Sequence, residues 1–367
     1  MIESNQQKQL KFPNEFPNDD YKLLEVTPDI LDNIKIHSKL TIKGSANEEA
    51  VLCTSNKTFT IKSGQTSNSL LLVGEKNEIT SILHSQLELI ETKPRLNTLL
   101  NVFQEGGKGC LNSLSDLYSE SDDTQYDTQL GVYLHDLFSS TQASDSEILQ
   151  YLHDNHCFQL PHNKRYIKLS KRVEYKLIDL VLSEITINSF QLDDLPIPQL
   201  LSKMSPTTPT FLIDHLLKKY STKTGEKVAL NLHELSITRA KQILTSPDTK
   251  PSDLQLNQFM ELWKDKLPST MPLGFPFTFD LIKSIAIIIT DSKQQKSLKY
   301  IDETSLSQVP KQRFRELFSI SNKWKITEIE PFIKNIIPPQ NSLEQFVLKF
   351  SRPINSADGE KLLVLRD

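Results

Sequence analysis

Three histidines and a cysteine near the middle of the chain have the side chains that bind zinc. His153, His156, Cys157 and His162 fall within ten residues, and imidazole nitrogens and thiolates are ligands that Zn²⁺ prefers. A spacing of three places His153 and His156 near one helix face, whereas Cys157 and His162 would have to fold back. Because no second pair of ligands completes a tetrahedral set, we favour an interpretation in which Cys157 and Phe158 belong to a core. We therefore predict no metal site.

A glycine-rich stretch, Gly-Gly-Lys-Gly at residues 106–109, resembles a phosphate-binding loop. A P-loop needs Gly-x4-Gly-Lys-Ser/Thr between a strand and a helix, but here glycine follows the lysine. We interpret the stretch as part of a linker and predict no cofactor.

Other catalytic signatures are also missing from the sequence. The chain has no Gly-x-Ser-x-Gly, His-Glu-x-x-His or Cys-x-x-Cys motif. These absences favour a protein that binds other molecules over an enzyme. An enzyme would need a pocket that gathers His153, His156 and Cys157 around a metal.

Basic side chains recur in the second half of the chain, on segments with the pattern of β-hairpins. We predict that the residues contacting DNA or an acidic protein partner are Lys164, Arg165, Lys168, Lys218, Lys219, Lys223, Lys227, Lys349, Arg352, Lys361 and Arg366. A further hairpin carries Lys293, Lys296 and Lys299. Lysines at hairpin tips are often only solvated surface, but their repetition favours phosphate contacts, which position a protein without reading sequence.

The elements that position these residues are repeated. LLKKYSTKTGEKVALNL, from Leu216, and VLKFSRPINSADGEKLLVLR, from Val347, each lead from an amphipathic helix through a turn into an alternating strand. The basic sites lie about 60 to 70 residues apart, which indicates an array of small modules. Helices closed by a basic two-stranded ribbon are typical of a winged helix. We predict winged-helix-like modules at residues 141–192, 193–250, 251–310 and 311–367.

Helix signals accompany this array. Ser144 and Glu147 form a capping box before an amphipathic stretch. The apolar run at Leu281–Ile288 is also predicted to be helical.

Residues 21–92 have a different character, with short β-rich runs separated by turn residues. Residues 1–20 are predicted to be a flexible N-terminus. Residues 21–92 are predicted to form a small barrel-like or sandwich domain with an open edge, which can pair with another chain. We expect partner subunits to pair at Leu40, Ile42, Val51, Leu52, Phe59, Ile61, Leu70, Leu71 and Leu72.

Residues 93–140 are predicted to form a helix and an acidic linker. Charge is distributed unevenly, with a net −11 over residues 1–163 and +7 over residues 164–367. The second half therefore favours a polyanion or an acidic partner, with weak and salt-sensitive affinity for DNA. Three scattered cysteines, no secretory signal and no run long enough to span a bilayer indicate an intracellular protein.

The predicted fold is α+β, with a small N-terminal β-barrel-like or sandwich domain followed by a tandem array of winged-helix modules. A winged-helix scaffold subunit of a nuclear complex that makes no DNA contact has the same predicted fold and remains an alternative.

Two blocks of the sequence resemble the sister chromatid cohesion Dcc family. Residues 23–73 contain Leu-Leu-Glu, Leu-x-Ile-Lys-Gly, Glu-x-Ala-Val-Leu-Cys, Lys-Thr-Phe and Thr-Ser-Asn-x-Leu-Leu. From Leu317, LFSISNKWKITEIEPFIKNI resembles the family block Phe-Ser-x4-Trp-x3-(Asp/Glu)-Ile-x-Pro-(Tyr/Phe)-Ile. The resemblance covers essentially the whole chain after residue 20.

This resemblance implies a non-catalytic nuclear subunit of an alternative replication factor C clamp loader. Its N-terminal strands would form a composite β-barrel with the large ATPase and the small subunit of the chromosome-transmission-fidelity loader, alongside the replication factor C small subunits. The winged-helix array would contact DNA and the catalytic subunit of DNA polymerase epsilon, and the sliding clamp would be reached indirectly. The implied role is clamp loading or unloading during DNA replication and sister chromatid cohesion, with no membrane contact.

Overall fold

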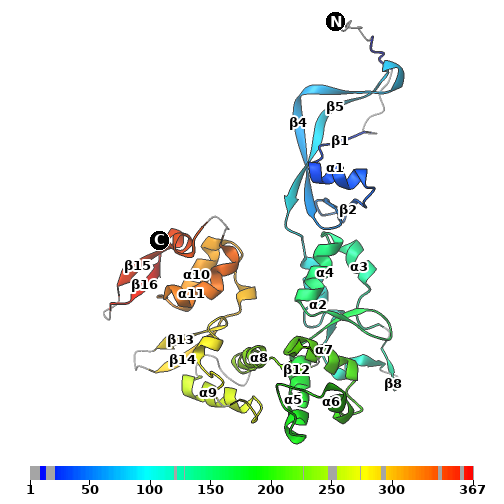
Figure 1. Ribbon diagram of the computed structural model, residues 1–367. Coiled ribbons are helices and arrows are strands. Elements are labelled where there is room, and N and C mark those ends of the chain that lie inside the picture. Colours follow the sequence, from blue (N-terminus) through cyan, green and yellow to red (C-terminus); the bar gives the residue numbers. More distant parts are fainter. Residues whose placement is uncertain are drawn as a thin grey trace. The chain divides into compact units, whose positions relative to one another are not determined.

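Figure 1 shows the chain as a computed structural model. It describes residues 9–13, 21–119, 122–127, 129–225, 227–246, 254–272, 274–290, 295–337, 341–355 and 359–366. The chain divides into two compact units, Met1–Glu174 and Tyr175–Asp367, and each is described by itself.

The first unit begins with a curled five-stranded sheet of order β1-β5-β4-β3-β2. The strands are β1 (Leu23–Leu24), β2 (Thr41–Lys43), β3 (Val51–Cys53), β4 (Thr58–Val73) and β5 (Ile79–Thr92). All pairs are antiparallel except β1 with β5. Helix α1 (Pro28–Lys35) buries Ile30 against Leu52, Phe59 and Leu89, so this small core holds the helix on the sheet.

β4 and β5 are much longer than their neighbours. Their ladder runs from Thr58↔Thr92 to Val73↔Ile79, and a short 3-10 helix, η1 (Glu75–Asn77), lies between the two strands. β3 pairs with β4 only at residues 58–60. Most of β4 therefore has β5 as its strand partner on one side and no strand of the described chain on the other.

The rest of the first unit mixes helices with short strands. Its elements are α2 (Asn97–Phe103), β6 (Cys110–Leu111), η2 (Leu114–Leu117), β7 (Tyr118–Ser119), β8 (Asp122–Tyr126), α3 (Leu134–Ser140), α4 (Asp145–Asp154), β9 (Phe158–Gln159) and β10 (Tyr166–Leu169). The structure differs from the expected acidic linker here, because Leu111 and Leu117 are fully buried. Their burial anchors β6 and η2, and β6 joins a sheet of order β6-β10-β9.

Helix α5 (Lys171–Ile187) begins at the end of the first unit, and helices and hairpins follow it. The helices are α6 (Ile197–Lys203), α7 (Thr210–Tyr220), α8 (Leu232–Leu244), α9 (Leu256–Asp265), α10 (Pro310–Ile320), α11 (Ile326–Ile333) and α12 (Leu343–Phe350), with 3-10 turns η3 (Phe279–Leu281), η4 (Glu303–Ser305) and η5 (Lys334–Ile336). The strands are β11 (Ser221–Thr224), β12 (Lys227–Leu230), β13 (Ala286–Thr290), β14 (Lys296–Tyr300), β15 (Ser351–Asn355) and β16 (Lys361–Leu365).

The three hairpins of the second unit share one hydrogen-bond frame. In each, the amide after the second strand donates to the carbonyl before the first: Asn231 to Tyr220 (2.8 Å), Ile301 to Ile285 (2.9 Å) and Arg366 to Phe350 (2.9 Å). A third segment also pairs with each second strand, through Leu195 N–H to Val228 O, Leu298 N–H to Leu254 O, and Trp324 N–H to Leu363 O. The predicted repetition of helices closed by a hairpin is thus present in the backbone.

Two tryptophans anchor the second unit. Trp263 and Trp324 are at most 1% exposed, and each indole N–H reaches a carbonyl, Ser236 O at 2.8 Å for Trp263 and Ser321 O at 2.9 Å for Trp324. The expected mixture of α and β structure with a small N-terminal sheet is confirmed, whereas the winged-helix assignment stays a prediction. Within the described residues, no helix combines the length and apolar character needed to cross a bilayer.

Candidate partner-binding and nucleic-acid-binding surfaces

The residues predicted to pair with partner subunits fall into two groups. Val51, Leu52 and Phe59 are at most 4% exposed and form the interior of the sheet itself. Leu40 and Ile61 are partly buried against the same core. These side chains hold the sheet together, so a partner strand would meet other residues.

The remaining residues lie at free surfaces of the sheet. Ile42, on the edge strand β2, is 67% exposed. Leu70, Leu71 and Leu72 lie in what we call the outer hairpin, residues 63–73 of β4 and 79–87 of β5. Leu71 is exposed, and Leu70 and Leu72 are partly exposed, so a partner can reach these three side chains.

Near its tip, at residues 70–73 and 79–83, the outer hairpin carries apolar side chains on both faces. Leu70 lies opposite Leu83, and Leu71 lies opposite Ile82. Successive side chains of a strand point to opposite faces, so these two pairs occupy different sides of the ribbon. Leu71 and Val73 are 41% and 43% exposed. An isolated two-stranded hairpin is marginally stable in water, and open edges with apolar faces favour pairing with added strands.

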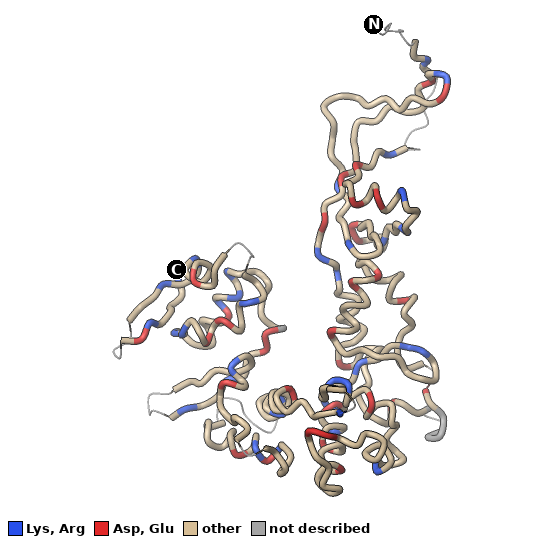
Figure 2. Tube along the Cα trace, in the orientation of Figure 1, with Lys and Arg blue, Asp and Glu red and all other residues tan. Residues whose placement is uncertain are grey.

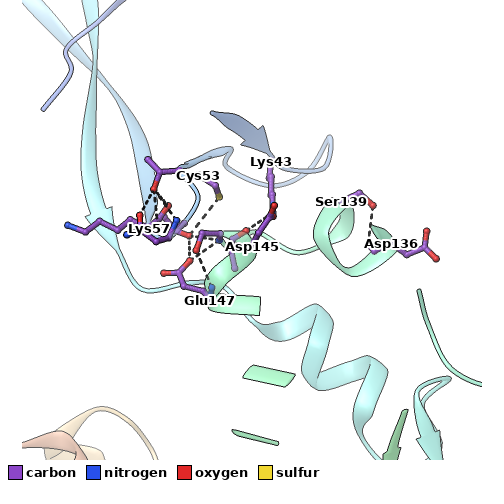
Figure 3. Close-up of polar contacts among 12 residues, drawn as sticks. Lys43, Cys53, Lys57, Asp136, Ser139, Asp145 and Glu147 are labelled. Atoms are coloured by element: carbon purple, nitrogen blue, oxygen red, sulfur yellow. Dashed lines mark hydrogen bonds and ion pairs between the residues drawn. The ribbon is translucent and has the colours of Figure 1, made fainter. Parts of the chain in front are cut away.

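The start of β4 is fixed to helix α4 by a buried polar junction (Figure 3). The Thr58 hydroxyl donates to Glu147 Oε2 at 2.6 Å and accepts from the Ser144 amide at 3.1 Å. Ser144 and Glu147 also form the predicted capping box of α4, with both reciprocal bonds present. Thr58 is fully buried, so the start of β4 and the start of α4 share one set of hydrogen bonds.

Two further contacts complete the junction. Lys43, at 7% exposure, donates from Nζ to Ala143 O at 2.6 Å and lies 3.4 Å from Asp145 Oδ1 (Figure 3). The first turn of a helix leaves amides without intrahelical partners, and in α4 the Ser146 amide donates to Ser55 O at 3.1 Å. The capping-box spacing indicates where α4 begins, but no sequence signal identifies its partners on β2, on β4 and in the turn between β3 and β4.

The basic residues of the first predicted hairpin are only partly available. Lys164, at φ 60°, is exposed. Arg165 stacks its guanidinium 4.5 Å above the Tyr133 ring and donates to Gln129 O at 2.7 Å. Lys168 donates to Asn155 at 3.1 Å. Arg165 and Lys168 therefore support the module's own structure, which leaves Lys164 as the accessible cation.

In the second predicted hairpin, most lysines contact an acidic or aromatic side chain. Lys218 pairs with Asp214 at 2.7 Å, and Lys227 pairs with Asp194 at 3.3 Å. Lys219 lies 5.1 Å above the Tyr220 ring. Lys223 is exposed near the tip of the hairpin. Asp214 and Asp194 offset the charge of Lys218 and Lys227, so Lys223 is the better candidate for phosphate.

Figure 2 shows Lys and Arg residues spread along the chain trace, and register places the C-terminal cations on more than one face of the β15–β16 hairpin. Arg352, Lys361 and Arg366 are exposed, and Lys349 donates to Asn341 at 3.3 Å. Register pairs Arg352 with Val364 and Asn355 with Lys361. Because faces alternate along a strand, Arg352 and Arg366 share one face of β15–β16, and Lys361 lies on the other.

The remaining hairpin contributes less to a basic surface. Lys293 lies outside the described residues. Lys296 and Lys299 lie three positions apart on β14 and thus face opposite sides of the strand.

The histidine and cysteine cluster is spread over a helix end and a turn. His153 has a side chain that is 85% exposed and lies 3.2 Å from Asp154, a hydrogen bond that lowers the pKa of that carboxyl group. Cys157 packs against the core around Tyr151, and burial raises its pKa to about 12. His162 stacks on Tyr126 with ring centroids 4.5 Å apart. Among the residues that the structure describes, no three His, Cys, Asp or Glu side chains gather to hold a metal ion.

The glycine-rich stretch forms a tight turn after α2. A Cβ on Gly107 would lie 2.3 Å from the carbonyl oxygen of Val102, and one on Gly109 would lie 2.7 Å from the Phe103 ring. Close packing therefore explains these glycines without a bound phosphate.

Comparison with known proteins adds independent information. Residues 21–333 match the model of the family "Sister chromatid cohesion protein Dcc1". The chain is 40% identical over 390 residues to "Probable sister chromatid cohesion protein DCC1" of Dictyostelium discoideum, covering 98% of this chain and 97% of that protein. It is 24% identical to the Mus musculus "Sister chromatid cohesion protein DCC1" (91% and 84% covered) and 25% identical to the Homo sapiens protein of that name (90% and 85% covered). These relatives are named as cohesion proteins and not as enzymes.

Proposed function

The chain belongs to the sister chromatid cohesion protein Dcc1 family, and we propose that it is a non-catalytic adaptor subunit of an alternative replication factor C clamp loader. It acts in the nucleus, in DNA replication and sister chromatid cohesion. It helps to bring the loader to DNA and to the replicative polymerase, where the sliding clamp is loaded or unloaded.

The outer hairpin is the observation that carries this proposal. Its two strands run beyond β3 and present apolar side chains on both faces, with Leu71 and Val73 exposed. Strands supplied by the large ATPase and the small subunit of the chromosome-transmission-fidelity loader would satisfy the open edges and cover both faces. The replication factor C small subunits then belong to the same assembly through the large subunit.

The helix-and-hairpin repeats are proposed to be winged-helix modules that contact DNA and the catalytic subunit of polymerase epsilon. The accessible cations Lys164, Lys223 and Lys361 would contact phosphates, which gives weak and sequence-independent binding. The net charge of +7 over residues 164–367 supports this role.

Co-purification of the loader with a Leu71→Asp variant tests the central step. Because Leu71 is 41% exposed, the change should leave the free chain folded but place a carboxylate inside the composite sheet. We expect recovery of the large ATPase and the small partner to fall by about tenfold or more. Leu262→Asp is a matched control, since Leu262 is 43% exposed on α9.

Undiminished recovery with Leu71→Asp, at an unchanged melting temperature, would remove the outer hairpin from the interface. Recovery of the wild-type chain with a different nuclear complex, without loader subunits, would instead favour the alternative of a scaffold protein.

A further inference from the structure

The three hairpins of the second unit can be compared position by position, because their registers are equivalent. Ser221 pairs with Leu230, Ala286 with Tyr300, and Ser351 with Leu365. The side chains of these pairs lie on the face that carries the buried Leu298 and Leu363. We call the opposite face of each hairpin its outer face.

The outer face of β11–β12, the first of these three hairpins, is polar. It carries Thr222, Thr224, Lys227 and Ala229. The first three are exposed. This is the composition of a sheet face that contacts water.

The outer face of the middle hairpin, β13–β14, carries Ile287 opposite Lys299 and Ile289 opposite Ser297. Ile287 is 5% exposed and belongs to the core cluster that contains Phe314 and Leu317 of α10. Ile289 packs against the same cluster. On this hairpin, the chain therefore packs a helical module against the isoleucines of the outer face.

The C-terminal hairpin, β15–β16, carries more aliphatic side chains on this face, although only Ile354 matches an isoleucine of β13–β14 by position, namely Ile289. Its outer face carries Ile354 opposite Leu362, and Val364 opposite Arg352. The three aliphatic side chains are all partly exposed. From this hairpin, the members of the neighbouring core cluster are Leu363 and Leu365, which lie on the inner face. The outer face is thus an apolar strip that its own module does not use as core.

Charge surrounds this strip. Arg352 and Arg366 are exposed on the same face. Beside β16, next to the segment that contains Trp324, Lys325 pairs with Glu360 at 2.7 Å. The two arginines therefore give the face its net charge. An apolar centre with arginines at its margin complements a protein surface that carries carboxylates beside apolar side chains.

The edge of this hairpin is unsuited to strand addition. Pro353 pairs with Leu363 in the ladder. A proline has no N–H, and it is tolerated in a ladder where its nitrogen faces away from the partner strand. The open edge of β15 therefore lacks a donor at its centre, and a partner must approach the outer face instead.

We propose that the outer face of β15–β16 binds an amphipathic helix of a partner protein, with acidic residues beside its apolar stripe. The middle hairpin of the same chain supplies the precedent of a helical module on this face. DNA is a poor occupant, because phosphates gain nothing from Ile354, Leu362 and Val364, and Lys361 lies on the other face. The inference rests on the proposed function and assigns the polymerase contact, rather than the DNA contact, to this face.

The test uses the assembled loader complex, with the catalytic subunit of polymerase epsilon and a duplex DNA as separate ligands. Leu362→Thr with Val364→Thr places β-branched residues, which favour strands, in β16 and removes most of the apolar strip. Arg352→Glu is a second variant that leaves the strip intact and reverses one charge. We expect each to weaken polymerase binding by about tenfold while DNA binding stays within about twofold. Lys361→Glu should instead weaken DNA binding while polymerase binding stays within about twofold.

Three outcomes would overturn the inference while leaving the adaptor role in place. They are unchanged polymerase binding in both variants, an equal loss of DNA binding, and a loss only of self-association, which would make a second copy the occupant. If the wild-type complex does not bind the polymerase at all, the proposed polymerase contact fails, and this inference fails with it.

Discussion

Ser221 and Ser351 make the same hydrogen bond in two different modules. The Ser221 hydroxyl donates to Leu217 O at 2.6 Å, and the Ser351 hydroxyl donates to Val347 O at 2.8 Å. Each serine is the first residue of a strand, and its side chain reaches back to a carbonyl in the last turn of the preceding helix. For Ser351, this carbonyl also accepts from the backbone amide of the same residue. The equivalent bonds indicate that the two modules share a helix-to-hairpin corner.

Ser351→Ala is expected to destabilise the second unit more than Ser221→Ala. Ser351 is fully buried, so Ser351→Ala loses a buried hydrogen bond at a cost of about 1 kcal/mol, although the Val347 carbonyl keeps its bond from the backbone amide of residue 351. Ser221 is only partly buried, and water can replace its hydroxyl. Urea unfolding followed by tryptophan fluorescence measures the free energy of unfolding of each variant. An equal loss for the two variants would contradict this expectation.

Much of this repetition could be predicted from the sequence, because local patterns encode it. The stretches that begin at Leu216 and Val347 share helix, turn and alternating strand, and the structure gives them one register. The predicted helix at Leu281–Ile288 was wrong, because the 3-10 turn η3 ends at Leu281, a turn follows, and β13 begins at Ala286. The run of isoleucines there is β-branched and favours a strand, and Ile287 fits a face that another module covers.

Long-range relationships could not be predicted in the same way. Val51, Leu52 and Phe59 were expected at a partner interface, but apolar alternation does not distinguish a subunit's own core from a surface that a partner covers. Ser144 and Glu147 were identified as a capping box, whereas their bonds to Thr58 depend on packing between segments far apart in the sequence.

Thr58→Val should loosen the junction between the sheet and α4. Valine has the shape of threonine but cannot donate to Glu147 or accept from Ser144, and unsatisfied buried groups cost about 1–3 kcal/mol. Cys53 lies 3.8 Å from the Thr58 hydroxyl and is 2% exposed. Its alkylation rate, in a background with Cys110 and Cys157 changed to serine, should therefore rise.

Thr60→Val is the control for this experiment, because Thr60 lies on the same strand but only partly buried. If both variants label at the wild-type rate, the junction does not limit opening of the sheet.

Arg313→Met should destabilise the C-terminal module strongly. The guanidinium is fully buried and donates to Ser307 O, Phe332 O and Leu306 O at 2.6 to 3.2 Å. Burial lowers the pKa of Arg313 from its ordinary value, yet these carbonyls hold the cation in place. Leaving them without donors costs about 3 kcal/mol or more.

The exposed Arg315, on the same helix α10, provides the matched change. Arg315→Met should leave the urea midpoint nearly unchanged, and a loss equal to that of Arg313→Met would show that helix propensity, not the buried hydrogen bonds, is responsible.

Stability should fall at high pH because of two buried acids in the first unit. Burial raises the pKa of the Cys157 thiol from 9.0 to about 12 and that of the Tyr151 phenol from 10.0 to about 12. The unfolded chain loses these protons first, so the free energy of unfolding decreases from about pH 9 towards pH 12. Cys157→Val, measured by urea unfolding across this range, should flatten the decrease, and an unchanged slope would exclude the thiol as its source.

The salt dependence of DNA binding should separate accessible cations from those used internally. Each phosphate contact contributes about 0.9 to the slope of log K against log salt concentration. Lys361 is exposed, so Lys361→Gln should reduce the slope by about that amount. Lys168 donates to Asn155 at 3.1 Å, and Lys168→Gln should therefore leave the slope unchanged.

Fluorescence anisotropy with a labelled duplex, over about 50 to 200 mM salt, covers the range in which counterion release dominates. The two lysines carry the same charge, so a difference in slope can come only from where the structure places them. Equal slopes for both variants would mean that charge alone, without the geometry of the hairpins, governs contact with DNA.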